Sequence, residues 1–498
     1  MGNWPVFMYD LIEQAPLRWA FYNRRRWLPV LIVVLVGLAS GVASGWLIAE
    51  FDPIPALALL AAAGYVAWIL GDIEIAYWGV LGIVTLLPFA SLPFSIGFTP
   101  TFLDLAMLGL FFVWIAPMAL GRKEFSFAFT PLDFAVIVFM FLAVGSFVAG
   151  LSHSAITSYL IRHFFEFLMS IAFFFLICDT VRRVPRLERL TRIFLLGAGC
   201  AALLGIVLYF LPDELTIRIL SALGRVGYPA GAGVLRFIRD DPELMQRATS
   251  TSVDPNVLGS LLNLALGIAI PQLFADRPLW KRGWLVLLIG VLGLCLGLTV
   301  SRGSMVGAGV AILALGVLRY RKILPILVVV LLLVLAVPWT QDLVTHFVEG
   351  LQGEDLSTQM RFGEYKDALT LIQRYPLLGV GFAGAPDIDT YVGVASIYFL
   401  IAEEMGLVGL AGFLVIIGLV FYDFWQHREN VAALPQLEPL WYGLHAAILG
   451  GLVGGVFDHY FFSLDFHHSV TIFWFLLALA SSATRIIISH AHIDVPAS

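Results

Sequence analysis

Apolar runs of about 20 residues recur along nearly the whole chain, and they decide what it can fold into. A helix of that length spans the roughly 30 Å hydrocarbon core of a bilayer. Of the 498 residues, 60% are hydrophobic and only 13% are charged, whereas soluble globular domains carry about 25% charged residues. The sequence therefore predicts an all-α, polytopic transmembrane bundle.

The number of spans is about 14, within a range of roughly 12 to 14. The third and fourth runs are interrupted by Pro88 and Pro93. The first run is too long for the apolar core of a cleavable signal peptide, so we expect an uncleaved first span. In chain order the runs cover residues 27–48, 54–71, 75–92, 102–119, 131–151, 160–178, 191–211, 256–275, 283–300, 303–319, 323–339, 395–424, 438–457 and 467–488.

Lysine and arginine fall on alternate connections, and this sets the predicted orientation. Residues 24–26 are all arginine, whereas the short loop near residues 152–158 has no lysine or arginine. By the positive-inside rule, both termini are cytoplasmic. The predicted plan is a cytoplasmic segment at 1–26, transmembrane helices 1–11 at 27–339, an extracytoplasmic loop at 340–394, transmembrane helices 12–14 at 395–488 and a cytoplasmic tail at 489–498.

The 340–394 loop is the longest polar interval between the apolar runs, and part of it has helical period. The period begins at Ser357 and stops before Pro376, which a helix does not continue through. An amphipathic helix here would form a lid or wall over a site at the bilayer surface. The residues predicted to share its apolar face are Phe362, Tyr365, Ala368, Leu369 and Ile372.

Several polar side chains are predicted to converge on the outer side. Arg302 stands out because it lies in a tight turn between two apolar spans, and a charge at such a place indicates a functional site. Arg361 lies in the long loop, and Arg162 lies in the outer part of the sixth span. Guanidinium groups bind phosphate bidentately and stay charged when buried. An arginine-lined outer cavity therefore suits a lipid-linked diphosphate.

Simpler interpretations stay open for the same residues. Arg162 and Glu166 are four residues apart, a spacing that also gives an ordinary ion pair within a helix. Asp254 is placed to cap the helix that follows it, with Asn256 in the first turn. The three cysteines lie in apolar runs without metal-ligand spacing, which indicates buried thiols. No metal, nucleotide or haem site is indicated, and no strands are evident.

Four motifs follow one another in the second half of the chain. They read DPNxLG from Asp254, SRGSxxG from Ser301, RxxxxxDAxxLIxxxPLLGVGF from Arg361 and YxxxxEEMGLVGL from Tyr398. In this order and topology they resemble the O-antigen ligase and polymerase superfamily, polytopic enzymes of bacterial surface-polysaccharide assembly. The resemblance covers roughly residues 190–488.

The resemblance implies metal-independent, inverting glycosyl transfer at the outer face of the bacterial cytoplasmic (inner) membrane. The donor would be an undecaprenyl-diphosphate-linked glycan, and the acceptor a glycan or lipid hydroxyl. No cofactor and no nucleic acid is implied, but membrane lipids and other polysaccharide-assembly proteins are expected partners. The residues assigned to substrate binding are Arg302, Arg361, Arg162, Asn256 and Tyr398.

One departure from the family pattern concerns the catalytic base. Ligase-like members carry a His-Asn pair at the positions that Ala395 and Ser396 occupy here, and neither of these residues takes up a proton at neutral pH. The base is therefore displaced, unnecessary or lost, the last giving a non-catalytic homologue. The candidates to replace it are His459, which we favour because of its ordinary pKa, together with Asp458, Glu404, Glu403 and Glu364.

Two other functions compete with glycosyl transfer. A transporter or flippase for an anionic lipid-linked substrate would show internal repeats and polar groups at the bilayer midplane. The two halves show no convincing duplication, and the polar clusters are predicted on the outer side. A structural scaffold would leave the outer arginines without a role. The sequence does not distinguish a polymerase from a ligase, nor the sugar, the linkage or the oligomeric state.

Overall fold

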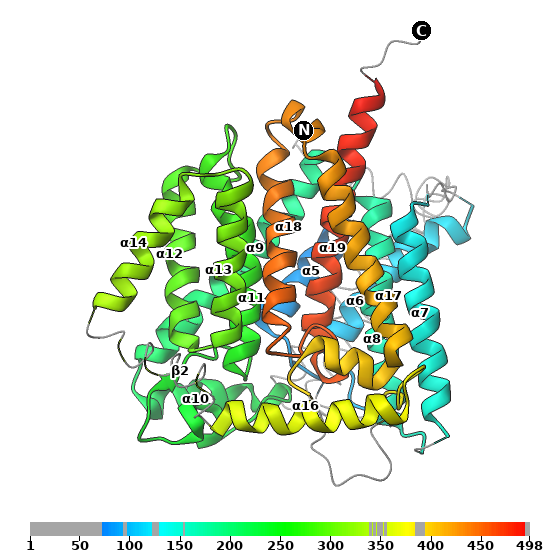
Figure 1. Ribbon diagram of the computed structural model, residues 1–498. Helices are drawn as coiled ribbons and strands as arrows, with labels where there is room; N and C mark the ends of the chain where they lie inside the picture. Colours follow the sequence, from blue (N-terminus) through cyan, green and yellow to red (C-terminus); the bar gives the residue numbers. More distant parts are fainter. Residues whose placement is uncertain are drawn as a thin grey trace, which may run out of the picture. The chain divides into compact units, whose positions relative to one another are not determined.

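The computed structural model describes residues 72–92, 97–121, 129–152, 155–337, 356–383 and 394–493, with isolated residues between 341 and 352 (Figure 1). The chain divides into two compact units, one of residues 1–77 and 108–123 and one of residues 78–107 and 124–498. Every site discussed below lies within the second unit. The first two predicted spans and the segment 1–26 lie outside the described residues.

Eight helices among the described residues are long and apolar enough to cross a membrane. The predicted membrane-spanning helical protein is thereby confirmed, whereas the total of 14 spans and the orientation of the termini remain predictions. The eight are α6 (Phe102–Ala119), α7 (Pro131–Gly150), α8 (Ser158–Thr180), α9 (Val184–Phe210), α11 (Pro255–Ala269) with its 3₁₀ extension η4 (Ile270–Phe274), α12 (Arg282–Thr299), α17 (Ile397–His427) and α19 (His467–Ile493).

Helices that are shorter or too polar to span a membrane complete the described structure. They are α5 (Ile73–Leu86), α10 (Asp213–Ala222), α13 (Arg302–Leu318), α14 (Ile323–Ala336), α16 (Leu356–Arg374) and α18 (Glu438–Gly454), with 3₁₀ turns η1 (Leu223–Val226), η2 (Ala232–Val234), η3 (Ile238–Asp240), η6 (Asn430–Ala433) and η7 (Leu464–Phe466). A two-stranded antiparallel pair, β1 (Arg236–Phe237) with β2 (Gln246–Arg247), lies between α10 and α11. The expectation of no strands was wrong here, because two residues a side are too few to give a period.

The helices α11, α13 and α18 pack closely through small residues. A Cβ atom added at Gly267 of α11 would lie 2.8 Å from the Cα atom of Ala447 in α18. Asn263 of α11 donates from Nδ2 to the carbonyl of Gly450 at 2.9 Å. Small residues let helix backbones approach in this way, and a buried amide bonded across the contact fixes the register. This packing holds the amino-terminal ends of α11 and α13 near the end of α18.

The predicted amphipathic helix is present as α16, and in Figure 1 it runs crosswise to α17 and α18 at their lower end. Its packed side was only partly predicted. Ala368 is 1% exposed, but Phe362 is 61% and Leu369 is 47% exposed. Leu371, which is 3% exposed, packs in their place. The buried side is rotated because it also takes in the polar contacts of the residues around Glu364, so apolar periodicity alone misplaced it.

A glycine-rich segment after α16 is bonded into a break in α17. Gly406 has a φ of 69° inside α17, which favours glycine and interrupts the helix. The amides of Val380 and Gly381 donate to the carbonyls of Glu403 and Glu404 at 2.9 and 3.0 Å. The carboxyl end of α16 is therefore joined to α17 through backbone hydrogen bonds.

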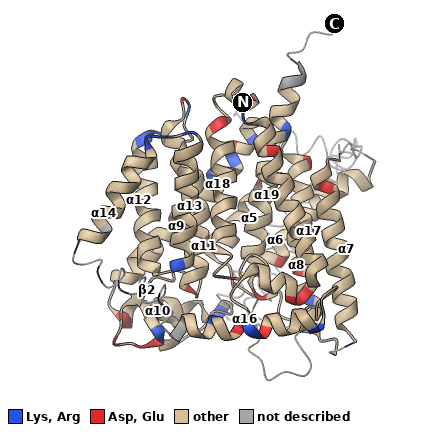
Figure 2. Ribbon diagram, viewed as in Figure 1, with Lys and Arg blue, Asp and Glu red and all other residues tan. Residues whose placement is uncertain are grey.

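Figure 2 shows that the charged residues of the second unit gather mainly toward the two ends of its helices. Arg319 and Glu438 pair at one end, with Nε and Oε1 2.6 Å apart. Arg361 and Asp458 lie at the other end, where α16 is found. The long apolar middle sections are what a bilayer core requires.

Candidate functional site

The turn before α13 presents Arg302 as the first residue of that helix. Val300 adopts a left-handed conformation with a φ of 53°, which reverses the chain directly after α12. The Ser301 amide donates to Oγ1 of Thr299 at 3.2 Å and holds the turn closed. Gly303 lies against the next connection, since a Cβ atom there would be 3.2 Å from Oδ2 of Asp458. The turn thus brings Arg302 beside the loop that follows α18.

Arg361 reaches the same loop from α16. Its Nη2 atom lies 3.7 Å from Oδ1 of Asp458, and the two side chains are 20% and 13% exposed. One turn further along α16, the Tyr365 hydroxyl donates to the carbonyls of Val456 at 3.1 Å and Ala395 at 3.2 Å. The amide of Ala395 donates to Oε2 of Glu364 at 2.9 Å. These contacts fix Arg361 over Asp458.

A third arginine, Arg247, joins this region from β2. Its Nη2 atom donates to Oδ1 of Asn256 at 2.6 Å, and its Nε atom donates to the Thr299 carbonyl at 2.8 Å. Burial lowers the pKa of the Arg247 guanidinium, and the positive charge of Arg302 lowers it further against the pull of Asp254, Tyr460 and Asp458. We call Arg247, Arg302, Arg361 and Asp458 the arginine cluster.

Sequence reasoning placed Arg247 in an outer loop but did not assign it to the site. Arg247 is positioned by a strand pair of two residues a side, and its carbonyl partner lies in a turn about 50 residues further along the chain. Neither the strand pair nor the turn produces a hydrophobic period in the sequence. Asn256 was assigned to the substrate. Its side-chain oxygen accepts from Arg247 and so positions that arginine, while its contact with substrate stays a prediction.

Asp254 caps α11, as predicted. Its Oδ1 atom accepts from the amides of Asn256 at 2.7 Å and Val257 at 3.2 Å. The Tyr460 hydroxyl donates to the same oxygen at 3.2 Å. Because Tyr460 lies two residues after Asp458, this bond fastens the loop after α18 to the start of α11.

Asp458 and His459 are adjacent but differ in their proton affinity. Burial raises the pKa of Asp458 to about 7, although Arg361 acts in the opposite direction. Burial lowers the pKa of His459 below its usual value, so its imidazole is neutral at pH 7. Within the described part of the chain, Nδ1 of His459 is buried and has no hydrogen-bond partner. Asp458 can therefore accept a proton near neutral pH, and it is also the one in contact with an arginine.

Three other predicted residues have partners outside the arginine cluster. Arg162 pairs with Glu166, its Nε atom 2.6 Å from Oε1, and with Asp104, its Nη2 atom 3.5 Å from Oδ2. Tyr398 donates to the carbonyl of Leu452 at 2.9 Å and so links α17 to α18. The main chain of Glu404 accepts from the segment after α16, which makes this residue part of the α17 break.

Residues 284–414 match the family model described as O-Antigen ligase. This match confirms the resemblance to the O-antigen ligase and polymerase superfamily that the four motifs predict. The family acts in general by glycosyl transfer from lipid-linked glycans at a membrane. The matched segment contains α13, α16 and the start of α17, and therefore Arg302 and Arg361. No curated protein matches the chain closely enough to be counted as a relative.

Proposed function

We propose that the protein is a membrane glycosyltransferase that polymerises or ligates undecaprenyl-diphosphate-linked glycans at the outer face of a bacterial cytoplasmic membrane, with both termini inside. The observation that carries this proposal is the contact of Arg361 with the largely buried carboxylate of Asp458, whose charge also acts on the nearby Arg247, while the charge of Arg302 acts on Arg247 in turn. Guanidinium groups gathered near one titratable carboxylate suit a reaction in which a diphosphate leaves and a hydroxyl loses its proton.

In the proposed reaction, Arg302 and Arg361 bind the diphosphate of the donor through bidentate hydrogen bonds. The acceptor hydroxyl attacks the anomeric carbon from the face opposite the diphosphate. The new C–O bond forms as the bond to the diphosphate breaks, and the diphosphate leaves with the bonding electron pair. The arginines stabilise the negative charge that develops on it, so the configuration inverts and no metal is needed at the leaving group.

The proton of the acceptor hydroxyl goes to Asp458 in this scheme. A base works best when its pKa lies near the operating pH, and burial raises the pKa of Asp458 to about 7. When the donor diphosphate takes over Arg361, the carboxylate is freed from its ion pair and can accept the proton. His459 is the alternative base, and it would take over if Asp458 served only to hold Arg361.

The test uses the full chain purified in detergent or nanodiscs, with a polyprenyl-diphosphate-linked oligosaccharide as the donor. Arg302→Ala and Arg361→Ala should each reduce release of the polyprenyl diphosphate by about 100-fold, the usual effect of removing one group that stabilises a developing negative charge. Arg374→Ala, an exposed position at the far end of α16, is the matched control and should keep wild-type activity.

Near-normal activity in both arginine variants would refute the diphosphate-binding role. A wild-type protein that moves the lipid-linked donor across a vesicle membrane without consuming it would instead identify a flippase. All variants are compared by size-exclusion profile, so that misfolding is separated from loss of activity.

A further inference from the structure

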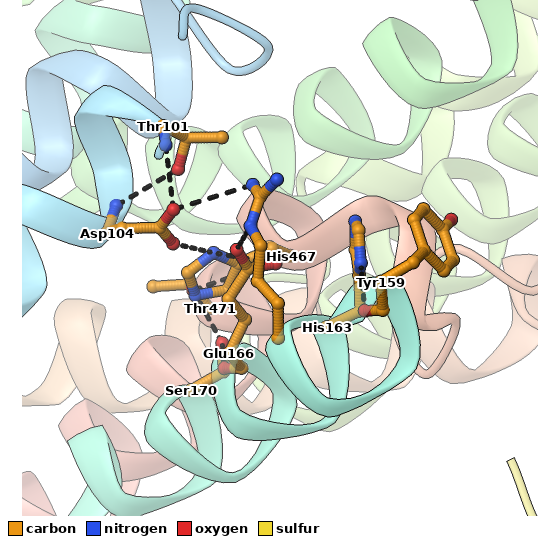
Figure 3. Close-up of polar contacts among 9 residues, drawn as sticks. Thr101, Asp104, Tyr159, His163, Glu166, Ser170, His467 and Thr471 are labelled. Atoms are coloured by element: carbon orange, nitrogen blue, oxygen red, sulfur yellow. Dashed lines mark hydrogen bonds and ion pairs between the residues drawn. The ribbon is translucent and has the colours of Figure 1, made fainter. Parts of the chain in front are cut away.

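A second polar cluster, which shares no residue with the arginine cluster, is formed by the amino-terminal portions of three helices. Asp104 belongs to the first turn of α6, Glu166 to α8 and His467 to the start of α19. All three residues are buried, and their ligand atoms lie within 4.8 Å of one another. Figure 3 shows the three side chains directed toward one another. We call Asp104, Glu166 and His467 the triad.

The two carboxylates each use one oxygen for fixed partners. Oδ2 of Asp104 accepts from the Thr101 amide at 2.7 Å and lies 3.5 Å from Nη2 of Arg162. Oε1 of Glu166 lies 2.6 Å from Nε of Arg162. The other oxygen of each carboxylate faces His467, whose Nδ1 atom is 3.6 Å from Oδ1 of Asp104 and 4.0 Å from Oε2 of Glu166. Oδ2 of Asp104 and Oε1 of Glu166 are therefore held by fixed partners. Oδ1 of Asp104 and Oε2 of Glu166 face the imidazole of His467.

Hydrogen bonding leaves the centre of the triad unsatisfied. The side chain of His467 is only 8% exposed, yet neither of its ring nitrogens has a hydrogen-bond partner in the described part of the chain. Within the same residues, Oδ1 of Asp104 is buried and has none either. Buried polar atoms are nearly always bonded, so several unpaired atoms around one point indicate a missing ligand.

The spacing identifies the kind of ligand. Zinc binds imidazole nitrogen and carboxylate oxygen at about 2.0–2.2 Å in tetrahedral geometry, so its ligand atoms lie roughly 3.4 Å apart. The 3.6 Å distance from the His467 nitrogen to Asp104 is close to this spacing, and the 4.0 Å distance to Glu166 reaches it after a side-chain movement of about 0.6 Å. With both carboxylates ionised, the single positive charge of Arg162 leaves the cluster with a net charge of −1, which favours a bound cation.

We propose that Asp104, Glu166 and His467 form a binding site for one Zn²⁺ ion that joins α6, α8 and α19. Arg162 then acts outside the coordination sphere by orienting both carboxylates, as groups around metal ligands commonly do. None of the three ligands is among the groups proposed to bind the diphosphate or to accept the proton, so the two proposals are tested separately. The sequence could not indicate it, because the three ligands are 62 and 301 residues apart along the chain.

One turn further along α8 and α19 than the triad residues, two hydroxyl groups join these helices. The Ser170 hydroxyl bonds to that of Thr471 at 2.8 Å, and Thr471 donates to the His467 carbonyl at 2.8 Å. This link fixes the main chain of His467 relative to α8 before any ion binds. A preorganised site of this kind loses less free energy on binding its ligand.

The experiment measures Zn²⁺ binding by the full chain in detergent, after chelator treatment and re-addition of ZnCl₂. Mass spectrometry of the metal content should give one ion per wild-type chain. Asp104→Asn and Glu166→Gln, which keep the shape of each side chain, and His467→Ala should each reduce the affinity by at least 100-fold. His163→Ala, at an adjacent histidine outside the triad, is the matched control and should bind like wild type.

Two further readouts make the outcome decisive. Zn²⁺ should raise the thermal unfolding temperature of the wild type and of His163→Ala, but not that of Asp104→Asn. X-ray absorption should show nitrogen and oxygen ligands near 2.0 Å rather than the thiolate distance of about 2.3 Å. Less than one tenth of an ion per wild-type chain, equal binding by the triad variants or thiolate ligation would overturn the proposal. Transfer activity is not needed for any of these measurements.

Discussion

The pH dependence of transfer should identify the base, because the two candidates lie on opposite sides of pH 6.5. Burial raises the pKa of Asp458 to about 7 and lowers that of His459 below its ordinary value. A base must be deprotonated to act, so the rate is full above its pKa and falls as the pH drops through it. With Asp458 as the base, kcat/KM at pH 6 should be about one tenth of the plateau at high pH, falling about tenfold for each further pH unit.

The assay follows polyprenyl diphosphate release by the wild type from pH 5 to 9 at low donor concentration, so that kcat/KM is obtained. A midpoint near pH 7 supports Asp458. The His459→Gln variant should keep that midpoint. If His459 were the base, the variant's kcat/KM would no longer fall at low pH. The stability of the protein is checked at each pH by recovery of activity after return to pH 8.

A flat profile between pH 6 and 8, or a midpoint below 6, would refute the assignment to Asp458. Removing Arg361 offers a second check. Its guanidinium lies 3.7 Å from the Asp458 carboxylate and stabilises the ionised form of that group. In Arg361→Gln the residual activity should therefore have its midpoint at a higher pH than the wild type.

Three further predictions concern single substitutions. Arg302→Lys should lower kcat/KM by about 10- to 100-fold, because a point charge cannot replace a bidentate fork, and wild-type kinetics would show that only charge matters. Arg247→Lys cannot keep the bonds to both Asn256 and the Thr299 carbonyl; we expect a lower unfolding temperature and weaker transfer, measured by thermal shift and the same assay. Asp133→Asn should destabilise the fold by about 3 kcal/mol, since it removes the negative charge of a fully buried carboxylate that lies 2.5 Å from Nη2 of the partly exposed Arg485; an unchanged thermal unfolding temperature would contradict this.

Local signals in the sequence predicted local structure well. Helical period gave the start of α16 and Pro376 gave its end, each to within a residue, and Asp254 was expected to cap α11. The spacing of Arg162 and Glu166 also predicted the ion pair that forms between them. These features depend on residues a few positions apart, so helical geometry alone determines them.

Contacts between distant elements were predicted only where a family motif marked them. Arg302 and Arg361 were assigned together from the motifs, and both meet the loop at Asp458. Arg247 was missed because its partners depend on the strand pair and the turn at Thr299. The neighbours of Arg162 on α6 and α19 were missed for the same reason, since periodicity within one helix carries no information about which helix lies beside it.

The backbone bonds between the segment after α16 and the break in α17 determine how α16 can move. Its carboxyl end is tied by the amides of Val380 and Gly381, so any swing of the helix pivots there. Arg361 lies 13 residues from Arg374, which is a lever of about 20 Å at 1.5 Å per residue. A rotation of about 10° at the pivot would displace Arg361 by about 3 Å, but it would first have to break the bonds that Glu364 and Tyr365 make to Ala395 and Val456. Backbone bonds at one end and side-chain bonds at the other therefore hold α16 in place along its length.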